Sequence, residues 1–519
     1  DPYRPLENDT AAATLAWVEA ENKVTQDYLS QIPFRNSIRQ RIEQLNNYPK
    51  TGMPTKLHDG KYYFSKNDGL QNQYVLYRSE TPDGDAEVFL DPNKLSDDGT
   101  VALTGIYQSH DGKYTAYTIS RSGSDWTEIY VMDTETGKLL DDHIEWAKFT
   151  GAAWQGDGFY YSAYEKPADG KEFSNANEYH KVFYHKLGTP QSEDKVIYEN
   201  RNEPLHFHNV GITDDESVLF VMGGGAGNGN SLYIKDLTKP NSKWITVEDS
   251  QDYDISVIDS RDGKLYIFTS ADAPRYRLVT ADVSAPQRAN WKELVPENKD
   301  AVLVNTDFAG DKMILTYDKD ASHHAYVYNI DGTPVREITL PTYGTLSFST
   351  DSKSPEAFYS FASFTTPASI YRYNVDSGES SLFRSTELQG FNPDDYITEQ
   401  VFYPSSDGTK IPMFLTYRKG IERNGKNPVY LYGYGGFNIT LNPSFSANRL
   451  IWLENGGIYA QANLRGGGEY GEEWHLAGTK QNKLNVFNDF ISAAEYMIEQ
   501  GWTNPELIAI EGGSNGGLL

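Results

Sequence analysis

About the first fifty residues carry a helical pattern of apolar positions. Hydrophobic residues recur at helical spacing over 10–31, which predicts a helix whose apolar face packs against the rest of the protein. The same spacing predicts a second helix over 35–45. Pro49 lies four residues after this segment and cannot continue a helix, so we expect the helical region to end before it.

From about residue 54 to residue 390 the pattern becomes an alternation of aromatic and β-branched residues. Turn pairs such as Asp59-Gly60 and Asp111-Gly112 precede runs that read as strands, and in most units a second strand follows. These turns recur at intervals of about 40 to 58 residues, which is the period of a four-stranded propeller blade. Seven such units predict a seven-bladed β-propeller. A large sandwich with evenly spaced hairpins is the alternative.

After residue 390 extended runs alternate with a helical pattern. A helix is predicted over 485–500, Gly501 ends it, and an apolar strand follows over 507–511. Strands separated by helices are typical of a mostly parallel sheet. The other predicted strands span 399–403, 411–418, 428–432 and 457–462.

The last of these strands runs into Gly512-Gly513-Ser514-Asn515-Gly516. Gly-x-Ser-x-Gly between a strand and a helix is the nucleophile elbow of α/β hydrolases, in which a tight turn presents a serine hydroxyl. Glycines flank the serine because the crowded turn leaves no room for a Cβ. A glycine-rich loop with an incidental serine is the alternative, and the preceding strand and helix favour Ser514 as a nucleophile.

A glycine-rich loop, Tyr432-Gly433-Tyr434-Gly435-Gly436-Phe437, follows the apolar run 428–431. In α/β hydrolases a loop after an earlier strand supplies an oxyanion donor, and small residues let donors approach the place where negative charge develops. An ordinary flexible strand exit explains the same residues, so the pattern alone leaves both interpretations open.

These patterns predict an α/β hydrolase, incomplete at its C-terminus, combined with a seven-bladed β-propeller. A chain of 519 residues is too long for one core. We assign residues 1–70 to an N-terminal helical part of the hydrolase domain, 71–393 to the propeller, and 394–519 to the first part of the hydrolase domain up to the elbow.

Composition narrows the possible partners. The net charge is −27 without a cluster of basic residues, so nucleic acid and anionic membranes are disfavoured. Cysteine is absent, which excludes disulfides, thiolate metal sites and a cysteine nucleophile. His206 and His208 have no third ligand in the pattern, and the Gly-rich segment 465–474 lacks the Gly-Lys-Ser/Thr ending of a phosphate loop. We expect no metal and no cofactor.

Four segments together resemble the prolyl oligopeptidases. They are 402–414 (FYPSSDGTKIPMF), 432–438 (YGYGGFN), 463–474 (NLRGGGEYGEEW) and 512–519 (GGSNGGLL). Two propeller segments, 89–93 (FLDPN) and 95–103 (LSDDGTVAL), resemble the family as well. The resemblance therefore covers essentially the entire chain, in the order helical N-terminus, seven-bladed propeller and hydrolase domain. Asparagine after the serine separates this family from dipeptidyl peptidases, acylaminoacyl peptidases and oligopeptidase B.

The resemblance implies a serine endopeptidase that cleaves short peptides on the C-terminal side of proline through an acyl-enzyme. It implies that Ser514 is the nucleophile, that the Tyr434 hydroxyl and the Asn515 backbone N–H hold the oxyanion, and that Phe437 lines the apolar pocket for the proline ring. In this family the propeller caps the cleft and excludes folded proteins, so short proline-containing peptides are the expected partners.

The resemblance also places the triad aspartate and histidine beyond residue 519. We therefore expect this chain to be a segment of a longer polypeptide that is inactive without its C-terminal segment. We also expect it to act as a monomer. A periplasmic or secreted location is favoured, and the cytoplasm is the alternative. Two other functions stay open: a non-catalytic propeller binding module with a vestigial hydrolase domain, and a related exopeptidase or esterase. The physiological substrate and its route of entry are not predicted.

Overall fold

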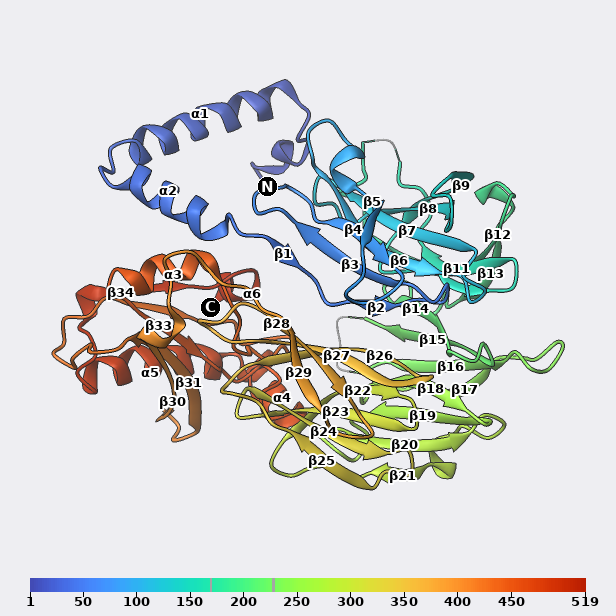
Figure 1. The fold of residues 1–519 in the computed structure, drawn as a ribbon. Coiled ribbons are helices and arrows are strands. Elements are labelled where there is room, and N and C mark those ends of the chain that lie inside the picture. The colour runs from blue at the N-terminus through green and yellow to red at the C-terminus, as the bar shows by residue number, and fades with distance from the viewer. Residues whose placement is uncertain (169, 226–228) are drawn as a thin grey trace.

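A computed structural model describes residues 1–168, 170–225 and 229–519. Two helices at the N-terminus lead into a propeller of blue to yellow strands, and the orange and red C-terminal part forms a second sheet with helices (Figure 1). The predicted fold class is confirmed in both parts.

The N-terminal helices have the predicted extents but only partly the predicted packing. They are α1 (Ala12–Leu29) and α2 (Arg35–Asn46), and α2 lies on α3 (Ala447–Glu454). Arg41 Nη2 lies 2.5 Å from the Glu454 carboxylate, and Leu45 is buried against Leu450 and Leu453. The apolar face of α1 is exposed instead of packed, with Tyr28 70% exposed. That expectation was wrong for the described structure.

Seven four-stranded blades form the propeller, and the second and third share one continuous sheet through Ala147 opposite Ala163. The short β1 (Lys50–Thr51) also pairs with β3. In chain order the blades are β2 (Thr55–Lys56), β3 (Tyr62–Asn67), β4 (Val75–Ser79), β5 (Ala86–Leu90); β6 (Val101–Gln108), β7 (Tyr114–Arg121), β8 (Thr127–Asp133), β9 (Leu139–Ala147); β10 (Ala153–Gln155), β11 (Gly158–Ala163), β12 (Lys181–Lys186), β13 (Lys195–Glu199); β14 (Phe207–Ile212), β15 (Val218–Gly224), β16 (Ser231–Asp236), β17 (Ile245–Glu248); β18 (Ile255–Arg261), β19 (Lys264–Thr269), β20 (Arg277–Asp282), β21 (Lys292–Val295); β22 (Val302–Ala309), β23 (Lys312–Lys319), β24 (Ser322–Asn329), β25 (Pro334–Ile338); and β26 (Thr345–Asp351), β27 (Ser354–Ala362), β28 (Ser369–Asn374), β29 (Ser380–Arg384).

The first and seventh blades meet side by side without a shared strand in the described residues. Polar contacts join them: Ser349 Oγ donates to Thr55 Oγ1 at 3.0 Å, and Arg384 Nη2 donates to the Pro82 carbonyl at 2.9 Å. In the first blade β3 pairs with β4 through Tyr62 opposite Ser79, so the division that we drew after residue 70 falls inside this hairpin. The other domain boundaries stay predictions.

The C-terminal sheet has the strand order β30-β31-β33-β32-β34. β30 and β31 pair antiparallel, whereas β32 is parallel to both β33 and β34, as strands separated by helices require. The elements are β30 (Tyr396–Pro404), β31 (Lys410–Arg418), β32 (Val429–Tyr432), α3, β33 (Ile458–Ala462), α4 (Glu472–Leu476), α5 (Leu484–Glu499), β34 (Ile508–Glu511) and α6 (Asn515–Leu518). The predicted strands and the predicted helix over 485–500 are confirmed.

The C-terminal part contacts the rim of the propeller formed by hairpin loops of the fifth and sixth blades. Asn438 Nδ2 donates to the Tyr276 hydroxyl at 3.0 Å, and the Tyr470 hydroxyl donates to Asp320 Oδ1 at 2.7 Å. Asn438 belongs to the glycine-rich loop after β32, and Tyr470 to the glycine-rich segment after β33. The propeller therefore touches the two loops that surround the elbow.

Candidate active site

Ser514 lies in the turn between β34 and α6. Its backbone has φ +52° and ψ −112°, a conformation that L side chains rarely adopt and that costs on the order of 1–3 kcal/mol. Gly516 N–H donates to the Gly513 carbonyl at 2.7 Å, and Gly517 N–H donates to the Ser514 carbonyl at 2.8 Å, so the helix begins at once. The side chain is exposed. The backbone is thus that of the strained strand-to-helix turn predicted for a nucleophile elbow, and the role of Ser514 as nucleophile stays a prediction.

The two glycines of the motif are needed for steric reasons. A Cβ on Gly512 would collide with the Gly516 carbonyl, and a Cβ on Gly516 would lie 2.7 Å from the Gly433 carbonyl. Both contacts are with backbone, which cannot move aside as a side chain can. The turn thus demands glycine at both positions, which favours the elbow over an incidental serine.

The glycine-rich loop after β32 lies directly against this turn. Gly433 N–H donates to the Glu511 carbonyl at 3.2 Å, and Asn515 Nδ2 donates to the Tyr434 carbonyl at 2.6 Å. The structure therefore brings Tyr434, Ser514 and Asn515 together at the carboxyl ends of β32 and β34, as the sequence predicted for one site. Their roles in holding an oxyanion stay predictions.

Phe437 lies on the same loop but faces solvent. Its backbone has φ +56° and its side chain is 68% exposed. An exposed aromatic ring on this loop offers an apolar surface without forming a closed pocket among the described residues. The assignment of Phe437 to the proline pocket therefore stays a prediction.

The segment after β33 packs against the glycine-rich loop. Asn438 N–H donates to the Gly466 carbonyl at 3.1 Å, and a Cβ on Gly466 would lie 2.7 Å from the Gly435 carbonyl. This segment is anchored by Arg465, whose guanidinium lies 2.6 Å from Asp489 on α5 and 2.6 Å from Asp407. The hydrogen bond from Arg465 lowers the pKa of Asp407 to about 2. The interpretation of this segment as a structural loop near the cleft agrees with these contacts.

Glu469 is a buried acid under the same loops that the sequence did not single out. It is 1% exposed, and burial raises the pKa of its carboxyl to about 7. Its Oε1 accepts from Asn463 Nδ2 at 3.1 Å and from Leu441 N–H at 3.2 Å. Its Oε2 is buried with no hydrogen-bond partner in the described ranges. In the sequence, the position of this glutamate within the Gly-Gly-Gly-Glu-Tyr run was the signal that could have pointed to a buried acid.

We expect Glu469→Gln to remove a pH dependence of stability. In the folded state the pKa of the Glu469 carboxyl is about 7, whereas in the unfolded chain it returns to its ordinary value of 4.5. Ionising the buried carboxyl therefore costs stability as pH rises, by about 2.5 kcal/mol between pH 5 and pH 8. Urea unfolding of the hydrolase part at both pH values measures this slope. Parallel changes in wild type and variant would show that Glu469 is not the source.

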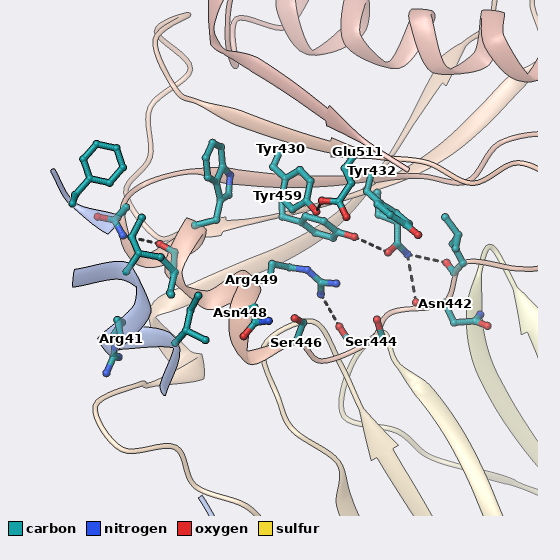
Figure 2. A pocket seen from close by; sticks show the side chains of 18 of the residues that line it. Arg41, Tyr430, Tyr432, Asn442, Ser444, Ser446, Asn448, Arg449, Tyr459 and Glu511 are labelled. Carbon is teal, nitrogen blue, oxygen red and sulfur yellow. Dashed lines mark hydrogen bonds between the residues drawn. The ribbon is translucent and has the colours of Figure 1, made fainter. Parts of the chain in front are cut away.

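A cavity of about 1090 Å³ lies beside the site, between α2, α3 and the sheet (Figure 2). The Tyr430 hydroxyl donates to the Glu511 carboxylate on its wall, and Arg449 Nη1 donates to the Ser444 carbonyl at 2.7 Å. Neither Ser514 nor Tyr434 lines this cavity. It is therefore distinct from the space in front of the candidate nucleophile.

No group of three or more His, Asp or Glu side chains in 1–168, 170–225 and 229–519 is arranged to hold a metal ion. No helix among these residues is both long and apolar enough to cross a membrane. His208 is buried and shares hydrogen bonds with His180 rather than with His206.

Comparisons with known proteins agree with this geometry. The model of the prolyl oligopeptidase N-terminal β-propeller domain matches residues 1–386, and that of the prolyl oligopeptidase family matches residues 443–519. The prolyl endopeptidases of Elizabethkingia meningoseptica and Elizabethkingia miricola are 48% and 46% identical over all of this chain and 73% of their own length.

A solved structure from a study of two prolyl endopeptidases and their inter-domain dynamics superimposes with a TM-score of 0.94 at 36% identity, over all of this chain and 76% of the other. We expected this chain to lack its triad aspartate and histidine and to be inactive alone. These matches do not bear that expectation out, and it stays a prediction. The likeness that short segments indicated is confirmed over the whole chain, and the chain belongs to the prolyl oligopeptidase family.

Proposed function

We propose that this protein is a serine endopeptidase that hydrolyses short peptides on the C-terminal side of proline, with Ser514 as nucleophile. The observation that carries the proposal is the strained backbone of Ser514, held by glycines that no larger residue can replace. Relatives named prolyl endopeptidase, at 48% and 46% identity, support the substrate class.

In this mechanism Ser514 Oγ attacks the carbonyl carbon of the proline residue. The serine proton passes to a general base and then to the leaving amine, and the C–N bond breaks to leave an ester on Ser514, which water hydrolyses. In this proposal the general base is a histidine oriented by an aspartate, and we expect both after residue 519. The Tyr434 hydroxyl and the Asn515 N–H stabilise the negative charge on the carbonyl oxygen.

Phe437 supplies an apolar face for the proline ring, and the propeller limits access to short, unfolded peptides. A chamber that excludes bulk water strengthens the interactions that the oxyanion makes. The monomeric state and the periplasmic or secreted location stay predictions, because no contact or motif described above tests them.

A matched pair of internally quenched peptides tests the substrate class. The two peptides differ only in proline or alanine before the cleaved bond, and we expect kcat/KM to favour proline by about 100-fold, since an apolar pocket gains only what burial of the ring supplies. Equal rates at the two peptides would contradict the preference for proline, and cleavage of neither peptide together with hydrolysis of a terminal residue or an ester would favour a related exopeptidase or esterase. A fluorophosphonate label provides the second readout: labelling at a serine other than Ser514 would move the nucleophile elsewhere, and no labelling at all would favour a vestigial hydrolase domain.

A further inference from the structure

Lys483 reaches from the start of α5 into the contact between the elbow and the glycine-rich loop. Its Nζ donates to the Gly435 carbonyl at 2.8 Å and lies 3.4 Å from Asn515 Oδ1. The residue immediately precedes α5, so a rigid helix fixes its origin. The side chain is half-buried. A lysine on a third segment is thus shared between the two segments that carry Tyr434 and Ser514.

The Asn515 side chain also connects the elbow to the glycine-rich loop. Its Nδ2 donates to the Tyr434 carbonyl at 2.6 Å, and a Cβ on Gly436 would lie 2.6 Å from the same nitrogen. Two consecutive carbonyls of the loop, those of Tyr434 and Gly435, therefore receive donors from Asn515 and Lys483. The amide of Asn515 presents its oxygen to the lysine and its nitrogen to the loop.

The Lys483 ammonium has two neutral hydrogen-bond acceptors, the Gly435 carbonyl and Asn515 Oδ1. Among the residues that the structure describes, no carboxylate forms an ion pair with Lys483, and burial lowers the pKa of its amine. Gly435 has φ +62°. Because glycine adopts many backbone conformations with little cost, the peptide that carries this carbonyl needs a contact to hold it in place. A charged donor on such a carbonyl makes a hydrogen bond about twice as strong as a neutral one.

We propose that Lys483 is a positioning residue of the oxyanion hole, acting together with the Asn515 side chain. It fixes the Tyr434–Gly435 backbone against the elbow, so that the Tyr434 hydroxyl and the Asn515 N–H converge on one carbonyl oxygen. This inference rests on the proposed function, because it assigns Lys483 to the same site. Donors held in place before the reaction stabilise the transition state more than donors that must move into place.

Lys483→Met in the full-length protein tests this role, because methionine keeps the apolar stem and removes the charged donor. We expect kcat to fall by about 10-fold with KM nearly unchanged, as for an interaction made in the transition state. A peptide aldehyde ending in prolinal, which forms a tetrahedral adduct on the serine, is expected to bind about 10-fold more weakly. A product peptide ending in proline should bind as before. Lys483→Arg should recover most of both losses.

Two further variants separate this role from a structural one. Because Lys483 acts through the loop of Tyr434, its effect should shrink when it is combined with Tyr434→Phe, which removes the hydroxyl directly. Lys480→Met replaces a neighbouring exposed lysine and should leave both kcat and aldehyde binding unchanged.

The outcomes distinguish this inference from the function on which it rests. Unchanged kcat and aldehyde affinity in Lys483→Met would overturn the positioning role, provided that Ser514→Ala abolishes cleavage. Equal loss of product and aldehyde binding, or effects that add fully to those of Tyr434→Phe, would likewise overturn it in favour of a general packing role. Cleavage that survives Ser514→Ala would instead defeat the proposed function itself.

Discussion

Replacing Ser514 with alanine in the full-length protein is expected to reduce kcat/KM for post-proline cleavage by at least about 10⁴-fold. Alanine removes the only atom that the elbow presents to a carbonyl carbon, so no acyl-enzyme forms. The residual rate is what binding and oxyanion donors alone provide. Cleavage of a quenched proline peptide measures the loss, with mass spectrometry to exclude contaminating peptidases.

Two controls make this result specific. Binding of a product peptide ending in proline should persist in Ser514→Ala, since the side chain that is removed contributes little to ground-state contacts. Ser446→Ala is the matched variant, because Ser446 precedes α3 and makes no side-chain capping hydrogen bond. It should keep full activity. An alanine variant at 514 that retains post-proline cleavage would move the nucleophile elsewhere.

The parts of the fold that rest on local patterns were predictable from the sequence. Each propeller hairpin is built from residues within about one blade length, so turn pairs and alternating residues specify it without reference to the rest of the chain. The elbow is equally local, because the close contacts of Gly512 are with Gly516 in the same turn. The five residues from Gly512 to Gly516 therefore carry most of that geometry.

The parts that depend on long-range packing were not predictable in the same way. Periodicity shows that α1 has an apolar face but not what covers it, and Tyr28 proves exposed. The sequence places Lys483 before a helix, yet its contact with Gly435 depends on how α5 docks on the sheet. Nor does the motif around Phe437 reveal that its ring faces solvent.

Arg465 is the clearest case of a residue whose importance lies in a long-range partner, and we expect Arg465→Met to destabilise the hydrolase part by about 3–5 kcal/mol. Asp489 on α5 is fully buried, and the arginine supplies its Nε and Nη2 hydrogens to that carboxylate. Removing the arginine leaves a buried charge without its cation, which costs more than the lost contacts alone. Urea unfolding followed by tryptophan fluorescence measures the change.

Removing the charge on the aspartate as well provides the decisive comparison. Arg465→Met combined with Asp489→Asn should regain part of the stability, because the second change eliminates the unpaired buried charge that the first one creates. Arg418→Met, at an exposed arginine in the same sheet, should change the unfolding midpoint little. If the double variant is less stable than Arg465→Met by the full cost of Asp489→Asn alone, the two side chains act independently. In that case the Arg465–Asp489 pair does not anchor the 463–474 segment. Other contacts would then have to hold this segment and the Tyr434 loop that packs against it.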